Sequence, residues 1–241
     1  LHAAQAARLK VGYVPDYCAD EVADHTAAAV LALLRKLTPL DASVRAGEWA
    51  AVAVAKPLKP FTETVVGFYG MGQIGSAVKA RLSAFGFRFV VADPGLSPAA
   101  AQAQGVTLVS AGALLSQSDI ISLHAPGTAQ TRRFFNADRL AKMKPSAMLV
   151  NTARGVLVDE AAVADALNRG VIAGAALDVF EEEPLPQSSP LRTAKNCLLS
   201  PHAAWYSEVA MGRLQDLVAD DITRGLSGQA PRKPVPMPGG E

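Results

Sequence analysis

From Thr64 to Ser200 the chain alternates short apolar runs with stretches whose apolar residues recur at helical spacing. Strands that alternate with helices in this way are typical of a parallel sheet covered by helices on both faces. We therefore predict an α/β fold, a Rossmann-type doubly wound parallel sheet. The strand-like runs cover 64–69, 87–93, 106–109, 119–124, 147–152, 171–179 and 197–200. Helices are expected near 76–85, 111–116, 136–143 and 159–169, the last two capped by Asn136 and Asp159.

The helical segment before this region is apolar nearly all round. Asp20 is its expected N-cap, and the helix should run to about Leu37. A helix of this kind is buried, either in the core of its own subunit or against a second subunit. The pattern leaves both alternatives open, and a homodimer is the sharper hypothesis.

The remaining segments are less regular. Residues 3–9 should end a helix and 10–14 should form a strand, whereas 38–60 is predicted only as a connecting segment. A final helix is expected over 207–225, followed by an extended, proline-rich tail at 231–240.

The turn after the first strand contains Gly70, Gly72 and Gly75, the G-x-G-x-x-G spacing of a dinucleotide-binding turn. The first glycine allows the sharp turn, the second lets the backbone approach a pyrophosphate, and the third lets the helix pack closely on the strand. The N-terminus of that helix offers free N–H groups to the phosphates. Asp93 ends the next strand 18 residues after Gly75, where it can bind the adenine ribose and repel a 2′-phosphate. Strand, turn, helix and acid together predict NAD binding, with NAD preferred over NADP.

The bulk composition argues against several classes of protein. A formal net charge of +1 over 241 residues, without a basic block, argues against nucleic acid as a partner. The longest apolar run, residues 27–34, is too short to cross a bilayer, and no signal peptide is visible. Cys18 and Cys197 form neither a disulfide framework nor a metal-binding spacing, which favours a reducing cytoplasm and no metal. The chain begins with Leu1 in mid-pattern, so we expect a fragment or processed form that lacks an N-terminal region.

Polar residues follow several predicted strands, and the carboxyl ends of parallel strands meet at one edge, where ligands bind. Arg154 could bind a carboxylate through two parallel hydrogen bonds, although a lone arginine is more often a surface residue. His202 could transfer a proton at neutral pH, although a lone histidine is more often structural. One glutamate of 181–183 beside His202 would fix the imidazole tautomer. Asp178 could cap its loop or accept a hydrogen bond from a nicotinamide amide.

Longer motifs occur in the order found in one family. The chain resembles the D-isomer-specific 2-hydroxyacid dehydrogenases in the glycine turn and in four motifs: Val-Pro-Asp-Tyr-Cys (14–18), Asn-Thr-Ala-Arg-Gly (151–155), Leu-Asp-Val-Phe-Glu-Glu-Glu-Pro (177–184) and Ser-Pro-His (200–202). The segment His-Ala-Ala-Trp-Tyr-Ser-Glu (202–208) is similar to the branch that includes the C-terminal-binding proteins and their bacterial dehydrogenase relatives.

This resemblance implies a role for each candidate residue. Arg154 binds the substrate carboxylate and carbonyl, His202 is the general acid and base, and Glu183 is the partner of His202. Trp205 stands at the substrate pocket with Arg154 and His202, and His25 approaches the cofactor.

The resemblance also implies which residues line the NAD cleft, with Asp93 on the adenine ribose and Asp178 on the nicotinamide amide. The full set is Gly70, Met71, Gly72, Gln73, Ile74, Gly75, Asp93, His124, Ala125, Pro126, Thr131, Thr152, Ala153, Arg154, Asp178, His202 and Ala203.

Members of the family have a second, flavodoxin-like substrate domain, which implies three parts in this chain. Residues 1–12 are the expected remnant of that domain, 13–203 the NAD-binding domain with 20–37 as dimerisation helix, and 204–241 a helix and tail that return to the substrate domain. The implied function is that of an NAD-dependent oxidoreductase that interconverts a small 2-oxo acid and its D-2-hydroxy acid. The alternative is an NAD-sensing, dimerising interaction protein with vestigial catalysis. This alternative is similar to some members of the branch that has Trp205.

Overall fold

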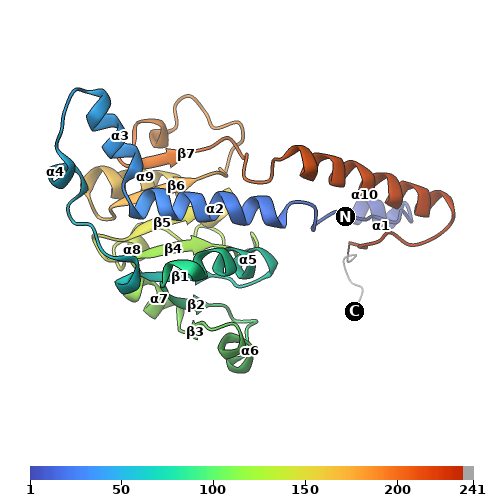
Figure 1. The fold of residues 1–241 in the computed structure, drawn as a ribbon. Helices are drawn as coiled ribbons and strands as arrows, with labels where there is room; N and C mark the ends of the chain where they lie inside the picture. The colour runs from blue at the N-terminus through green and yellow to red at the C-terminus, as the bar shows by residue number, and fades with distance from the viewer. Residues whose placement is uncertain (236–241) are drawn as a thin grey trace. The chain divides into compact units, whose positions relative to one another are not determined.

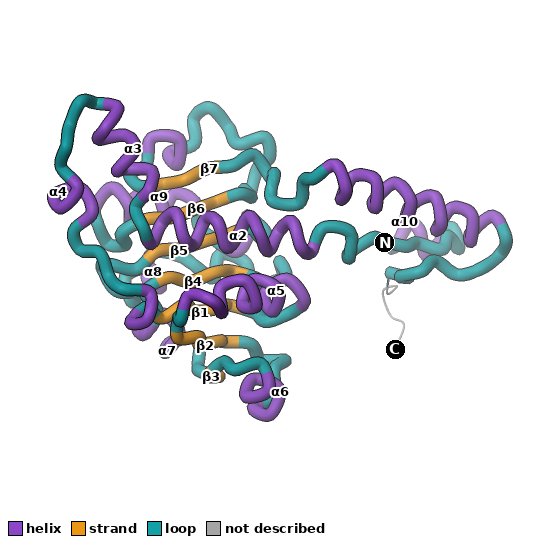
Figure 2. The backbone as a smooth tube through the Cα atoms, viewed as in Figure 1, coloured by secondary structure: helices purple, strands orange, loops and turns teal. Residues whose placement is uncertain are grey.

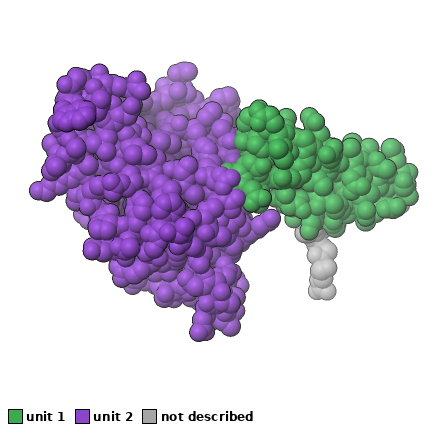
Figure 3. All heavy atoms as spheres, viewed as in Figure 1, with its two compact units in different colours: residues 1–21, 205–241 green, residues 22–204 purple. Residues whose placement is uncertain are grey.

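The computed structural model describes residues 1–235, and the end of the expected tail (236–241) lies outside the described residues. The chain divides into two compact units, which Figure 3 shows in different colours. Unit 1 consists of residues 1–21 and 205–241, and unit 2 of residues 22–204. The expected boundary after residue 12 differs from this division, because Tyr13, Asp16 and Tyr17 form hydrogen bonds with the C-terminal segment.

Unit 2 is built on a sheet in which every neighbouring pair of strands is parallel (Figure 1). Within the described residues it has seven strands in the order β3-β2-β1-β4-β5-β6-β7. The order reverses between β1 and β4, which is where ligands bind in sheets of this kind. The predicted Rossmann-type doubly wound sheet is confirmed. The strands are β1 (Val65–Tyr69), β2 (Arg88–Ala92), β3 (Thr107–Leu108), β4 (Ile120–Leu123), β5 (Met148–Asn151), β6 (Gly174–Leu177) and β7 (Cys197–Leu199).

Helices lie between and around these strands (Figure 2). Asn136 and Asp159 cap two of them, as predicted, because their side chains accept hydrogen bonds from the backbone N–H groups of Arg139 and Ala162. The α-helices of this part of the chain are α2 (Ala19–Leu34), α3 (Leu37–Arg45), α4 (Ala51–Ala55), α5 (Gln73–Leu82), α6 (Pro98–Ala103), α7 (Ala111–Gln117), α8 (Ala137–Leu140) and α9 (Glu160–Arg169), and the 3₁₀ turns are η1 (Phe61–Glu63), η2 (Ser83–Phe85), η3 (Gly155–Leu157) and η4 (Pro190–Thr193).

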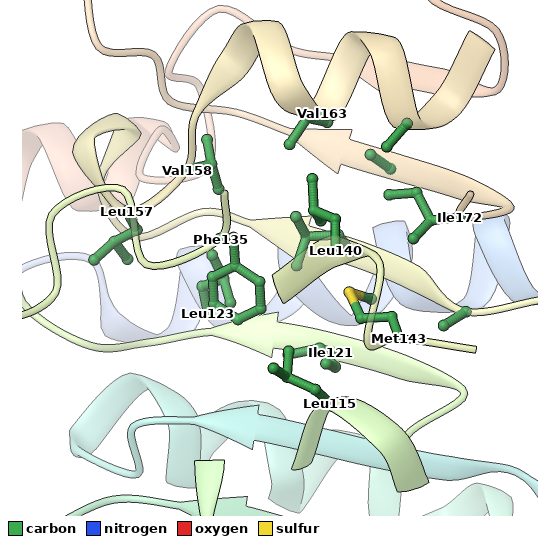
Figure 4. Close-up of a cluster of buried hydrophobic side chains, with 14 of the residues drawn as sticks. Leu115, Ile121, Leu123, Phe135, Leu140, Met143, Leu157, Val158, Val163 and Ile172 are labelled. Atoms are coloured by element: carbon green, nitrogen blue, oxygen red, sulfur yellow. The ribbon is translucent and has the colours of Figure 1, made fainter. Parts of the chain in front are cut away.

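Two apolar clusters cover the sheet, one on each face. On one face, buried side chains of α7, α8 and α9 pack against β4, β5 and β6; Figure 4 shows Leu115, Leu140 and Val163 of this cluster. On the other face, α2, α5 and α6 pack against β1, β2 and β4. Helix α2 therefore buries Ala23, Ala27 and Val30 in the core of its own chain, one of the two alternatives that its pattern leaves open.

The helix expected over 20–37 is shorter than predicted. It begins at Ala19, so Asp20 lies in its first turn and is not its N-cap. It ends at Leu34, and Lys36 follows in the left-handed region with φ of 51°. A new helix, α3, begins directly afterwards, and with α4 it fills part of the segment 38–60 that the sequence predicts only as a connection.

Two predicted strands also need correction. Within residues 1–235, the segment 10–14 forms an isolated antiparallel bridge between Gly12 and Pro234 in place of the predicted strand. The bridge is flanked by hydrogen bonds from Tyr13 to Lys233 and from Val235 to Val11. The strand predicted over 171–179 is limited to β6, because the N–H of Val171 donates to Ala166 at the end of α9 and keeps the preceding residues in a turn.

Unit 1 contains helices α1 (His2–Ala6) and α10 (Glu208–Leu226). Ser207 caps α10, so the predicted final helix is confirmed to within about a turn. A bidentate ion pair joins Arg232 to Asp16, with N–O distances of 2.8 and 2.9 Å. Large apolar side chains remain exposed on this unit, namely Leu1, Leu9, Tyr13, Tyr206, Val209, Val218, Ile222 and Leu226.

A buried carboxylate joins the start of β1 to the start of β4. Asp119 accepts hydrogen bonds from the Nζ atoms of Lys59 and Lys144, both at 2.9 Å, and from the N–H of Val65 at 2.8 Å. Burial by itself would raise the pKa of Asp119, but the N–H of Val65 and the two ammonium groups outweigh it and hold the pKa below its ordinary value.

We predict that Asp119→Ala lowers the free energy of unfolding by about 2–3 kcal/mol at pH 7, because it leaves a buried N–H and two ammonium groups without their partner. Urea titration measures this change. Since the folded pKa of Asp119 lies below the unfolded value of 3.8, the stabilisation is complete above that pH and is lost as the pH falls through the folded pKa. Asp165→Ala, which removes an exposed ion pair with Arg169, is the control and should cost under about 0.5 kcal/mol. Equal losses for the two variants would contradict this account.

Candidate functional site

The glycine turn connects β1 to α5. Gly70 has φ of +92°, and a Cβ there would lie 2.8 Å from the backbone nitrogen of Ala125, so only glycine fits. A Cβ on Gly75 would lie 3.1 Å from the Gly70 oxygen, which reflects the close approach of helix and strand. A Cβ on Gly72, by contrast, meets no protein atom within 4 Å. Open space therefore lies beside Gly72, at the N-terminus of α5, where unpaired helix N–H groups favour a phosphate. The residues present fit the pyrophosphate of NAD.

Asp93 directly follows β2 and supports the glycine turn. One carboxylate oxygen accepts the N–H of Met71 at 2.7 Å, and the other accepts the N–H of Gly95 at 2.8 Å. Asp93 thus lies next to the turn. Its contact with the adenine ribose stays a prediction.

The loop after β4 borders the same turn. His124 lies against Gly75, and its Nε2 is 2.9 Å from the hydroxyl of Ser122. Burial lowers the pKa of His124 to about 4, so the ring is neutral at physiological pH. Further along, the hydroxyl of Thr131 donates to the carbonyl of Pro126 at 2.6 Å and holds the loop in a compact turn.

The loop after β5 presents Arg154. Asn151, which sequence reasoning does not single out, organises this loop, because its side-chain NH₂ donates to the Arg154 carbonyl at 2.9 Å and its oxygen accepts the N–H of Ala153 at 3.1 Å. The Arg154 side chain is exposed, with one guanidinium N–H donating to Ala153 at 2.6 Å. The hydroxyl of Thr152 points to α2 instead and lies 2.7 Å from that of Thr26.

Asp178 follows β6 and is buried. Its carboxylate accepts hydrogen bonds from the hydroxyl of Ser200 at 2.5 Å and from the N–H groups of Ala203 and Ala204, both at 2.9 Å. The structure therefore gives Asp178 the loop-capping role, and its contact with a nicotinamide amide stays a prediction. His25 adjoins this network, with Nε2 3.2 Å from the Ser200 hydroxyl.

The structure brings together the expected acid–base pair, Glu183 and His202. The Nδ1 atom of His202 lies 2.7 Å from one oxygen of Glu183, and the other oxygen accepts the N–H of Phe180 at 2.9 Å. Burial alone would raise the pKa of Glu183, but these two hydrogen bonds hold it below its ordinary value, so the carboxylate is ionised at neutral pH. A hollow of about 580 Å³ adjoins the pair, lined by Phe180, Glu183, Pro184, Leu185, Arg192, Leu199, Ser200, Pro201 and His202.

The Arg154 loop lies directly against the loop that carries Glu183. A Cβ on Gly155 would lie 1.9 Å from the carbonyl carbon of Phe180, so the two backbones are in contact. Arg154, Glu183 and His202 thus follow β5, β6 and β7, three adjacent strands, at one edge of the sheet. Trp205, the remaining expected substrate residue, belongs to unit 1, where its ring packs 6.1 Å from that of Tyr17.

The chain is similar to known proteins over most of its length. Residues 27–204 match the family model for the D-isomer specific 2-hydroxyacid dehydrogenase, NAD binding domain. The chain belongs to this family. It is 37% identical over 229 residues to the glyoxylate reductase of Thermofilum pendens, covering 92% of this chain and 66% of the relative. It is 38% identical over 225 residues to the D-3-phosphoglycerate dehydrogenase of Methanocaldococcus jannaschii, covering 93% of this chain and 42% of that relative.

A solved structure has the same fold and contains NAD+. D-lactate dehydrogenase with NAD+ from Lactobacillus jensenii superposes with a TM-score of 0.87 at 26% identity, covering 98% of this chain and 74% of that one. The predicted cofactor, NAD, and the oxidoreductase class of the family are confirmed. Among the described residues, no helix has the length and apolar character needed to cross a membrane.

The glycine turn generates a test of cofactor binding. We predict that Gly72→Ala keeps the fold and melting temperature of the wild type, because its Cβ meets no protein atom. The same variant should weaken NADH binding by about tenfold or more, because the Cβ occupies space that the pyrophosphate needs. Gly70→Ala should instead destabilise the chain, because it combines a left-handed φ with a backbone clash. Fluorescence titration with NADH and thermal melting separate the two effects. Unchanged NADH affinity in Gly72→Ala would contradict the placement of the pyrophosphate.

The neutral ring of His124 generates a second test. The pKa falls from 6.5 in the unfolded chain to about 4 in the folded one, so stability is complete above about pH 6.5 and is lost as the pH falls toward 4. We predict that the ring resonances of His124 do not shift between pH 8 and 5.5 in NMR spectra, with His124→Gln supplying the assignment. That variant should also lose part of the decline in unfolding free energy between pH 6.5 and 4. A full titration of His124 near neutral pH would contradict its burial.

Proposed function

We propose that this chain is the NAD-binding and catalytic part of a dehydrogenase that interconverts a small 2-oxo acid and its D-2-hydroxy acid. The observation that carries the proposal is the hydrogen bond between His202, after β7, and Glu183, whose loop after β6 is in contact with the loop of Arg154. An ionised carboxylate on Nδ1 leaves Nε2 of the imidazole available for proton transfer. A pair of this kind suits reversible proton exchange with a hydroxyl or carbonyl oxygen.

Each residue then has a separate role. NAD supplies the hydride acceptor, or the hydride donor as NADH, when it is bound. The guanidinium of Arg154 binds the substrate carboxylate and polarises the carbonyl oxygen. In reduction, Nε2 of His202 gives its proton to that oxygen, and Glu183 stabilises the imidazolium; in oxidation, the neutral ring takes the proton back.

The relatives support the proposed type of reaction, but they do not point to one substrate. The matched proteins are named glyoxylate reductase, D-3-phosphoglycerate dehydrogenase and D-lactate dehydrogenase, which differ in their acids. The chain spans 66% and 42% of the length of the two relatives compared by sequence.

We propose that unit 1 belongs to a substrate domain, since exposed apolar side chains such as Val209, Ile222 and Leu226 need a covering partner. The segment 202–208, with Trp205, supports assignment to the branch of the C-terminal-binding proteins.

We further propose a homodimer. Helix α2 is largely used in its own core, but the residues after it expose apolar side chains: Leu37, Val44, Trp49 and Val52, with Trp49 93% exposed. A side chain of that size in water is typical of an interface. The dimer contact would then extend from the end of the predicted helix 20–37 into α3 and α4. Sedimentation of the wild type and of Trp49→Ser tests this proposal, with a monomer expected for the variant.

The catalytic assignment is tested by the loss of NADH absorbance with glyoxylate, hydroxypyruvate and bulkier 2-oxo acids. We predict that His202→Ala lowers kcat by about 10²–10⁴-fold, the range of general acid–base catalysis, with NADH affinity close to that of the wild type. Arg154→Ala should raise KM and lower kcat, because it removes both binding and polarisation of the substrate. Arg169→Ala, an exposed arginine on α9, is the matched control and should have wild-type kinetics. Unchanged kcat/KM in Arg154→Ala for every acid would contradict the mechanism, and cofactor-dependent sizing without turnover would favour an NAD-sensing interaction protein.

A further inference from the structure

The first of the three glutamates after β6 is not a solvated surface residue. Glu181 has a side chain that is 22% exposed, although Glu182, its neighbour in the same run, is exposed. Both of its carboxylate oxygens are engaged. One contacts Nη2 of Arg132, and the other accepts hydrogen bonds from Arg133, through Nη2 at 2.8 Å and Nε at 3.3 Å. The backbone N–H of Glu181 donates to the carboxylate of Glu160, at the start of α9.

The segment that carries the two arginines is joined to the loop that follows β5 through Arg133 and Phe135. The N–H of Arg133 donates to the carbonyl of Val156 at 2.6 Å, and that of Phe135 donates to Leu157 at 3.0 Å. Phe135 and Val158 then form a parallel bridge. The segment that follows the predicted cofactor loop therefore runs beside the residues directly after Arg154.

The cluster of Arg132, Arg133 and Glu181 is connected to the acid–base pair through Phe180. Phe180, which precedes Glu181, donates its N–H to Glu183, and Glu183 binds His202. The like charges of the three glutamates and of Glu160 repel one another. Arg132 and Arg133 offset this repulsion at Glu181, the one side chain of the three that is half-buried.

We propose that Arg132, Arg133 and Glu181 form a clamp that positions Glu183 against Nδ1 of His202. The inference rests on the proposed function, in which this pair exchanges the proton. The clamp holds together the loops after β4, β5 and β6, and so keeps the acid–base pair in register with Arg154. Glu181 is a positioning residue, because it acts through Phe180 and Glu183.

The test compares two neighbouring glutamates in the full chain. Glu181→Gln keeps the shape of the side chain but removes its charge, and Glu182→Gln is the matched control. In Glu181→Gln we expect kcat with the best 2-oxo acid to fall by about ten- to a hundredfold, the scale of a small misplacement of a catalytic group, with NADH affinity within threefold of the wild type. Proton NMR should also show loss of the far-downfield Nδ1–H signal of His202 that a carboxylate partner produces. Glu182→Gln should retain both the signal and kcat.

A second variant guards against simple unfolding. Arg132→Gln combined with Arg133→Gln changes side chains that are 56% and 52% exposed, so the fold should persist, as circular dichroism would verify. This double variant should reproduce the effects of Glu181→Gln. Adding Glu181→Gln to it should bring no further loss, because the three residues act as one unit.

The clamp is wrong if the Nδ1–H signal and kcat survive in Glu181→Gln, or if Glu182→Gln causes the same loss. It is also wrong if the effects of the arginine and glutamate variants add. A wild-type chain that reduces no 2-oxo acid would contradict the proposed function alone, and the NMR signal would still decide whether the clamp positions His202.

Discussion

The contact between Gly155 and the peptide that joins Phe180 to Glu181 is the constraint on which the arrangement of the candidate site depends. Gly155 has a hydrogen at a point where a Cβ would fall 1.9 Å from the carbonyl carbon of Phe180. Parallel strands bring their carboxyl ends to one edge, but their loops normally diverge over the surface. Here the missing side chain lets the loop with Arg154 touch the loop with Glu183, so that a cationic group and an acid–base pair share one region.

Buried or partly buried carboxylates organise that region from below. Asp178 collects three hydrogen bonds from the segment 200–204, and a charged acceptor makes each of them stronger than a neutral contact. Within this loop His202 has φ of 52°, in the left-handed region that few residues other than glycine adopt. The hydrogen bonds to Asp178 on either side of it hold the backbone in this conformation.

The sequence predicts the features that depend on local patterns. The glycine turn, the caps at Asn136 and Asp159 and the apolar strands β1, β4 and β5 arise from residues close together in the chain, and all are present. Helices α3 and α4 are missed because they are short and interrupted by residues such as Pro39 and Gly47, so their apolar positions do not build a recognisable period.

The candidate site is predicted only in part for a related reason. Arg154, Glu183 and His202 are recognised from motifs, but the pairing of Glu181 with Arg132 and Arg133 joins residues 48 and 49 positions apart. A run of acids is normally solvated, and no local pattern reveals which of its members turns inward. Asn151 is missed for the opposite reason, since its bonds are local but an asparagine at a strand end has many possible partners.

Asp93 has a consequence for attempts to redesign coenzyme preference. Its two oxygens accept hydrogen bonds from the N–H groups of Met71 and Gly95, so the carboxylate stabilises the turn as well as carrying negative charge. Replacing it with a short neutral residue, in order to admit a phosphorylated ribose, would also remove both hydrogen bonds and loosen the turn. A redesign that keeps an acceptor within reach of Met71, while placing a cation elsewhere on the loop, separates those two effects.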